Sequence, residues 1–139
     1  MKKLLSLLLV VILGVTLCAC GGNNATLKDY SGKWVREEWM NPTTGAVVSI
    51  TCFLYEDGTF TQEVDTSING YKEYQEYQGT WEINKDTIEL RKLRLVEGTD
   101  DLFDENGSPK DGIVHTSKLT IVDKITLESG GNKYFKEVS

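Results

Sequence analysis

The chain is poor in the residues from which enzymes and metal proteins build reactive sites. Its 139 residues include one histidine, His115, and three cysteines. A zinc site needs several cysteine or histidine ligands, so no zinc site is predicted. Composition alone leaves a Ser-His-Asp set open, but the Gly-x-Ser-x-Gly elbow is absent. We therefore expect no enzyme activity and no cofactor, and we expect His115 to be a structural residue on the apolar face of a strand.

An excess of positive charge is also missing. The whole chain has a net charge of −6, and the part after residue 19 carries −8, because the first nineteen residues hold Lys2 and Lys3 but no acid. A basic face is the usual footprint of nucleic-acid binding and of docking on anionic lipid head groups, so we expect neither. About 119 residues remain after residue 19, which suits one domain with one core.

The long hydrophobic run in the chain is at its N-terminus. Lys2 and Lys3 precede an apolar run of about fourteen residues, 4–17, which ends in Leu-Cys-Ala-Cys at 17–20. This run is shorter than the roughly 20 residues that span a bilayer. A basic start, a short apolar run and a small residue before the cleavage point are typical of a secretory signal. Together these residues resemble a bacterial lipoprotein signal with its lipobox.

That resemblance implies a cleaved signal peptide over 1–19 and a lipid on Cys20. Ala19 is small and lies directly before Cys20, as cleavage there requires. An uncleaved signal anchor and plain secretion after Ala19 are the alternatives. Two or more acyl chains anchor a protein stably. We therefore expect membrane attachment through Cys20 on the extracytoplasmic side of the cell membrane, a flexible tether over 20–28 and a domain over 29–139.

Cys52 is then the one cysteine left with a free thiol. Cys18 leaves with the signal and Cys20 takes the lipid, so the domain has no partner for a disulfide. Cys52 lies in an apolar run between Ile50 and Leu54. Free cysteines in such runs are usually buried, so we expect Cys52 to be buried and unreactive.

The domain shows the short, regularly punctuated pattern of a β-barrel or β-sandwich, without a helical apolar period. Turns are predicted at Asp57-Gly58 and at Asn69-Gly70. Gly79 either kinks one strand or separates two, and a change of apolar face along 87–96 predicts a bulge near residues 91–92. The expected strands are 33–40, 46–55, 59–65, 71–78 and 79–84 (joined or separate), 87–96, 113–122, 125–128 and 133–138.

The segment 97–112 is predicted to be a long polar loop. It contains several acidic residues, and oxygen ligands suit calcium. Aligned on an EF-hand loop, however, it places Leu102 and Ile113 where acidic ligands are required. We therefore expect a solvated, mobile and metal-free loop that contributes little to the core.

Three short motifs resemble lipocalins and other calycins. Ser31-Gly32-Lys33-Trp34 gives their opening Gly-x-Trp, 53–60 resembles a strand, Asp-Gly turn and strand, and Gly-Thr-Trp at 79–81 resembles a later strand. The resemblance implies an all-β fold, an antiparallel up-and-down meander that closes into a small lipocalin-like barrel of about eight strands. It also implies that Trp34 plugs the barrel floor, with Lys136 as a candidate partner. By strand alternation, the other interior candidates are Phe60, Val64 and Trp81.

Aromatic residues form a further group that could bind sugars or peptides by stacking. Their other interpretation is packing inside the barrel and across strands, which commonly uses tyrosine and tryptophan. The threefold spacing of the tyrosines divides them between the two faces of their strand. The group comprises Tyr71, Tyr74, Tyr77, Trp39 and Trp81.

The sequence therefore predicts a non-catalytic, lipid-anchored exported protein. An eight-stranded barrel is just wide enough to hold one small ligand or to be filled by side chains. The first case predicts binding of a small apolar ligand. The second predicts an interaction module for an envelope protein or a cell-wall polymer. A deep apolar pocket would favour the ligand, and a filled interior beside an exposed apolar patch would favour the module.

Overall fold

The computed structural model describes residues 26–138. The expected signal peptide over 1–19, the expected lipidation site Cys20 and most of the expected tether lie outside the described residues. No helix in the described part of the chain is long and apolar enough to cross a membrane.

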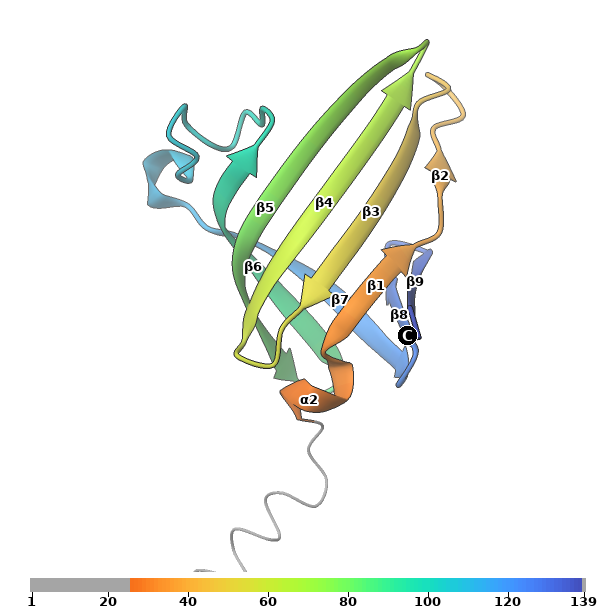
Figure 1. Ribbon diagram of the computed structural model, residues 1–139, viewed down its shortest axis with the longest axis vertical. Coiled ribbons are helices and arrows are strands. Elements are labelled where there is room, and N and C mark those ends of the chain that lie inside the picture. The colour runs from red at the N-terminus through yellow and green to blue at the C-terminus, as the bar shows by residue number, and fades with distance from the viewer. Residues whose placement is uncertain (1–25, 139) are drawn as a thin grey trace, which may run out of the picture.

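Eight antiparallel strands form a closed barrel (Figure 1). They follow one another around the barrel in chain order, and the ring closes because the first strand pairs with both the third and the last. This confirms the predicted all-β meander of about eight strands. The barrel strands are β1 (Gly32–Arg36), β3 (Val47–Leu54), β4 (Thr59–Ile68), β5 (Tyr71–Asn84), β6 (Thr87–Glu97), β7 (His115–Asp123), β8 (Thr126–Ser129) and β9 (Asn132–Lys136).

The predicted strand 33–40 is broken in two. β1 ends at Arg36, and the short β2 (Trp39–Met40) pairs with β3 further along, with Trp39 opposite Val48. At the break, the Glu37 N–H donates to the Lys133 carbonyl at 2.9 Å. One edge of β3 is therefore covered first by β1 and then by β2, which extends the sheet beyond the level that β1 reaches (Figure 1).

A short helix, α2 (Leu27–Tyr30), lies at the lower end of the barrel in Figure 1. Its start is fixed by a capping box, in which the Thr26 N–H and hydroxyl both donate to the Asp29 carboxylate. Tyr30 is buried, and Leu27 packs against the core. The helix begins inside the segment expected to be a tether, so the ordered domain starts before residue 29.

The kink and the bulge predicted for the fifth and sixth strands lie next to each other. β5 runs unbroken through Gly79, and the register with β6 shifts between Gln78 and Gly79, so that Leu93 has no partner. A Cβ on Gly79 would lie 1.8 Å from the Arg91 carbonyl oxygen. Only glycine fits so close to the neighbouring backbone, which explains why the strand can bend here without separating into two.

The core consists of two clusters along the barrel axis. The larger fills the lower part, next to α2; its buried members are Tyr30, Trp34, Cys52, Leu54, Phe60, Trp81, Ile88, Leu90, Leu119, Leu127 and Tyr134. The smaller cluster contains Tyr77, Leu95 and Phe103, with Val64 packed against them. Phe103 belongs to the loop between β6 and β7, which also holds the 3-10 turn η1 (Lys110–Gly112).

Candidate ligand-binding site

The lower end of the barrel is filled around Trp34. Its side chain is completely buried, and its indole Nε1 donates to the Tyr30 carbonyl at 2.8 Å. The Lys136 ammonium lies 5.9 Å from the centre of the indole ring and donates to the Asp29 carbonyl at 3.2 Å. Trp34 thus joins β1 to α2 and contacts the lysine suggested as its partner.

The other three interior candidates lie at different levels. Phe60 and Trp81 are buried in the lower cluster, and the Trp81 Nε1 donates to the Tyr55 carbonyl at 2.9 Å. Val64 is half-buried and packs against the upper cluster. The four residues therefore do not form one site: three of them fill the floor, and Val64 lies above it.

Burial of the inward-facing side chains decreases along the barrel axis. On β3, Leu54 and Cys52 are buried, whereas Ile50 is only half-buried although it belongs to the same face. On the adjacent β4, Phe60 and Gln62 are buried, whereas Val64 is half-buried. The upper part of the barrel interior is therefore less completely buried than the floor. This graded exposure makes the upper lumen the candidate binding site.

A polar layer separates the filled floor from the upper lumen. Gln62 is 5% exposed, and its Nε2 donates to the Cys52 sulfur at 3.4 Å. Arg36 continues the inward face of β1 above Trp34 and donates to the Val48 carbonyl at 3.3 Å. On the β6 side, the Lys92 ammonium lies 4.2 Å from the centre of the Tyr77 ring. Burial lowers the pKa of Lys92.

The loop after β6 contributes to the core, and the expectation that it would not is wrong. Phe103 is 4% exposed, and its ring centre lies 5.7 Å from that of Tyr77. The Leu95 N–H donates to the Gly107 carbonyl at 2.9 Å, and the Tyr77 hydroxyl donates to Asp100 at 2.6 Å. The loop is thus attached to the barrel through one aromatic side chain and several hydrogen bonds.

Asp100 connects this loop electrostatically to the lumen. Burial alone would raise the pKa of its carboxyl, but the hydrogen bonds from Tyr77 and from the Leu102 N–H, together with the charge of Lys92, lower it. His115 is half-buried, lies opposite Lys92 in the register of β6 and β7, and also favours the charged form of Asp100. Asp100 is therefore a carboxylate of the loop that lies within electrostatic range of Lys92 and His115.

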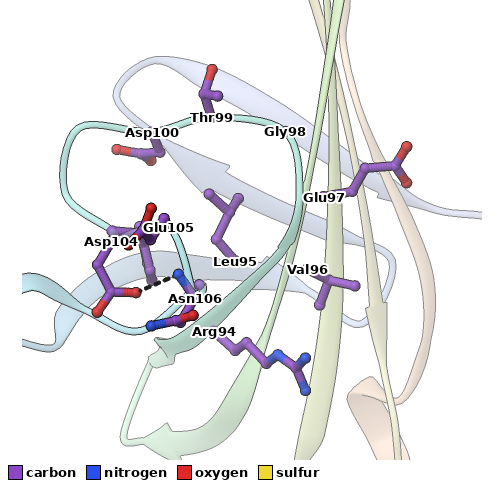
Figure 2. Close-up of a pocket in the computed structure, with 12 residues that line it drawn as sticks. Arg94, Leu95, Val96, Glu97, Gly98, Thr99, Asp100, Asp104, Glu105 and Asn106 are labelled. Atoms are coloured by element: carbon purple, nitrogen blue, oxygen red, sulfur yellow. Dashed lines mark hydrogen bonds between the residues drawn. The ribbon is translucent and has the colours of Figure 1, made fainter.

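A pocket of about 650 Å³ lies between the end of β6 and this loop. Figure 2 shows Leu95 projecting from β6 toward the loop, whereas Arg94 and Val96 point away. The loop side of the pocket is formed by turns in which Asp104 accepts from the N–H groups of Asn106 and Ser108. Within residues 26–138, no three acidic, histidine or cysteine side chains are grouped so that they could hold a metal ion.

The aromatic group divides between the faces of the barrel wall, as its spacing predicts. Tyr77 is buried in the upper cluster, whereas the Tyr74 hydroxyl donates to Glu76 at 3.0 Å. Trp81 fills the floor. Tyr71 and Trp39 remain 78% and 39% exposed. Packing therefore accounts for Tyr77 and Trp81 but not for Tyr71 and Trp39.

Cys52 is completely buried, as predicted, and burial raises the pKa of its thiol to about 12. Because the thiolate is the reactive form, native Cys52 should react very slowly with a thiol reagent at neutral pH. The same reagent should modify the chain rapidly and stoichiometrically after unfolding in denaturant. Absorbance-monitored labelling at both conditions checks this, and rapid labelling of the native state would contradict the burial of Cys52.

No family model matches the chain, and neither a curated protein nor a solved structure matches it. The lipocalin-like architecture therefore rests on the closed eight-stranded meander itself.

Proposed function

We propose that this chain is a membrane-anchored exported lipoprotein whose barrel binds a small, predominantly apolar ligand without catalysing a reaction. The anchor is the lipid on Cys20, on the extracytoplasmic face of the cell membrane. The ligand occupies the upper lumen, above the floor formed around Trp34.

One observation carries the binding proposal: inward-facing apolar side chains lose their burial above the polar layer. A barrel filled along its whole length would bury Ile50 and Val64 as completely as it buries Leu54 and Phe60. An apolar ligand would cover the part of these half-buried side chains that is still exposed and gain roughly 25 cal/mol for each Å² of apolar surface removed from water. The part of the wall formed by Ile50 and Val64 is therefore better suited to an apolar ligand than to solvent.

The anchor is tested by replacing Cys20 with serine. The hydroxyl cannot take the thioether-linked lipid, so Cys20→Ser should leave the membrane fraction or remain as an uncleaved precursor. Membrane fractionation with a size analysis on denaturing gels separates these two results from the wild-type behaviour. Normal size and normal anchoring of Cys20→Ser would overturn the lipobox assignment.

Ligand binding is tested on residues 26–138, which contain the whole closed sheet and both core clusters. The uncharged fluorescent probe N-phenyl-1-naphthylamine should bind saturably, with one probe per barrel. Val64→Ser should weaken that binding about tenfold, because it replaces an apolar wall by a hydroxyl. Val35→Ser, on the outer wall, is the matched control and should bind as the wild type does.

The second candidate function is that of an interaction module. It is supported by an exposed apolar pair on the outer wall of the barrel. Val35 and Phe135 lie directly opposite each other on β1 and β9 and are 37% and 43% exposed. Such an apolar pair on the outside of a barrel can contact another protein. No saturable probe binding, together with loss of a co-purifying envelope protein in Val35→Ser, would favour this function over ligand binding.

A further inference from the structure

The chain enters the domain at the lower end of the barrel, through α2. Thr26, the N-cap of this helix, follows Cys20 by six positions. An extended chain advances by at most about 3.6 Å per residue, so Thr26 lies within about 22 Å of Cys20. β5, by contrast, has 14 residues and is about 45 Å long at about 3.3 Å per residue. A lipid on Cys20 therefore holds the lower end of the barrel, and not the upper opening, close to the bilayer.

Two exposed aliphatic side chains project at this end from the turn between β7 and β8. Val122 and Ile125 flank the two residues at the tip of the turn and are 54% and 57% exposed. The turn lies beside α2 (Figure 1). Hydrogen bonds from Thr26 lower the pKa of the Asp29 carboxyl, and the nearby charge of Lys124 at the tip lowers it further. The aliphatic pair is thus next to the point where the chain enters the domain.

The backbone of this turn is paired within the protein. The Ile125 N–H donates to the Asp123 carboxylate at 2.9 Å, and the Ile125 carbonyl accepts from the Lys136 N–H at 3.0 Å. An unpaired backbone group costs free energy when it leaves water. Ile125 can therefore enter apolar surroundings without leaving its own backbone groups unpaired.

The turn between β3 and β4 adds an aromatic side chain at the same end. It lies close to α2, because a Cβ on Gly58 would be 3.7 Å from the Leu27 Cδ1. Tyr55, at the start of this turn, is 46% exposed. Tyrosine is favoured at membrane interfaces, since its ring is apolar and its hydroxyl remains hydrated. Exposed apolar surface is thus present on both turns that adjoin α2.

The lower end carries no excess of positive charge. The turn between β5 and β6 belongs to the same end, because the Ile121 N–H donates to the Asp86 carbonyl at 2.7 Å. Attraction to anionic lipid head groups requires a cluster of basic residues. Contact of this end with a bilayer must therefore come from its apolar side chains. The charged residues of α2 and the three turns are Lys28, Lys85 and Lys124 against Asp29, Glu56, Asp57, Asp86 and Asp123.

We propose that the lower end of the barrel docks on the lipid bilayer, with Val122 and Ile125 inserted at the boundary between head groups and acyl chains. This interaction surface rests on the proposed lipid on Cys20. The lipid keeps the turn at a high local concentration next to the bilayer, so a contact too weak to hold the free domain suffices. Lys124 extends its ammonium toward the head groups. The upper opening faces away from the bilayer, and a ligand enters it from the aqueous side.

Nitroxide quenching of a fluorophore at each end of the barrel tests this orientation. Because Cys52 is buried, an introduced cysteine is the reactive thiol of the lipidated chain. Lys124→Cys carries an NBD label at the lower turn, and Tyr71→Cys, at a position that is 78% exposed on β5, carries it at the upper end. In vesicles of phosphatidylcholine and phosphatidylglycerol, nitroxide lipids should quench the label at position 124 severalfold more strongly. Equal quenching at the two positions would overturn the proposal.

A second set of variants assigns the contact to the aliphatic pair. Val122→Ser/Ile125→Ser, added to the labelled Lys124→Cys chain, should reduce the quenching to the level found at position 71. Leu93→Ser/Val96→Ser is the matched control, because it removes two exposed aliphatic side chains from β6, and it should leave the quenching unchanged. Unchanged quenching in Val122→Ser/Ile125→Ser would overturn the insertion of these side chains.

The lipid dependence separates an apolar contact from an electrostatic one. Quenching at position 124 should persist in pure phosphatidylcholine and at high salt, since apolar contact needs no anionic lipid. Its loss under either condition would contradict the proposal.

Failure of the anchor and failure of the docking surface give different results. A chain that is absent from the membrane fraction would show that the proposed lipid on Cys20 is wrong. A chain that is anchored, but whose label at position 124 is no more quenched than that at position 71, would retain the anchor and refute the docking surface.

Discussion

Trp34→Ala should lower the free energy of unfolding by about 3–5 kcal/mol, the usual range for removing a large buried aromatic side chain. The indole is fully buried, and it donates the hydrogen bond that attaches β1 to the α2 backbone. Since domains of this size are stable by only about 5–15 kcal/mol, the variant should be close to unfolding. Urea denaturation followed by circular dichroism measures the loss.

Trp39→Ala is the matched control, because it makes the same substitution at a tryptophan that is 39% exposed. It should cost clearly less stability than Trp34→Ala. If Trp34→Ala kept wild-type stability but lost the binding of N-phenyl-1-naphthylamine, Trp34 would line the ligand site rather than close the floor.

Phe103→Ala should cost about 3 kcal/mol, the lower end of the range for a buried phenylalanine, because the loop can relax around the space left behind. Phe103 packs against Tyr77 and Leu95. Without it, the loop should separate from β6, and the hydrogen bond from the Leu95 N–H to Gly107 should open. Urea denaturation gives the global effect, and amide hydrogen exchange at Leu95 gives the local one.

The neighbouring Leu102→Ala provides the control, since Leu102 is 47% exposed and belongs to neither core cluster. Its stability should change by no more than about 0.5 kcal/mol. Equal, small effects of Phe103→Ala and Leu102→Ala would mean that the loop is not anchored by its aromatic side chain.

Much of the fold could be predicted because the domain alternates apolar and polar residues with a period of two. Local sequence chemistry was enough to predict the turns at Asp57-Gly58 and Asn69-Gly70 and the kink at Gly79. The break after Arg36 could not be predicted, because it depends on a hydrogen bond from Glu37 to the distant Lys133. The helix α2 was missed since its four residues are too few to show a periodic pattern.

The candidate site was harder to predict than the fold. The alternation that places Phe60 and Val64 inside also places Gln62 there, so this polar residue could have been identified from the sequence. Lys92 continues the inward face of Ile88 and Leu90 by the same alternation, because the bulge comes after it, at Leu93. Placing the bulge near residues 91–92 is what concealed this position. Phe103 was hidden in an acidic segment whose average polarity indicated a solvated loop. The burial of Phe103 is a property of a single side chain, and the average composition of the segment does not reveal it.

The pairing of β1 with β9 has a consequence for the order of folding. These strands come from opposite ends of the domain, yet the barrel closes only when Trp34 lies opposite Lys136. Contacts between distant parts of a chain form slowly, because a large loop must be closed first. A growing chain can assemble the hairpins from β3 to β6 early, but it must wait for β9 to complete the ring. Until then, both sheet edges remain open to pairing with another chain.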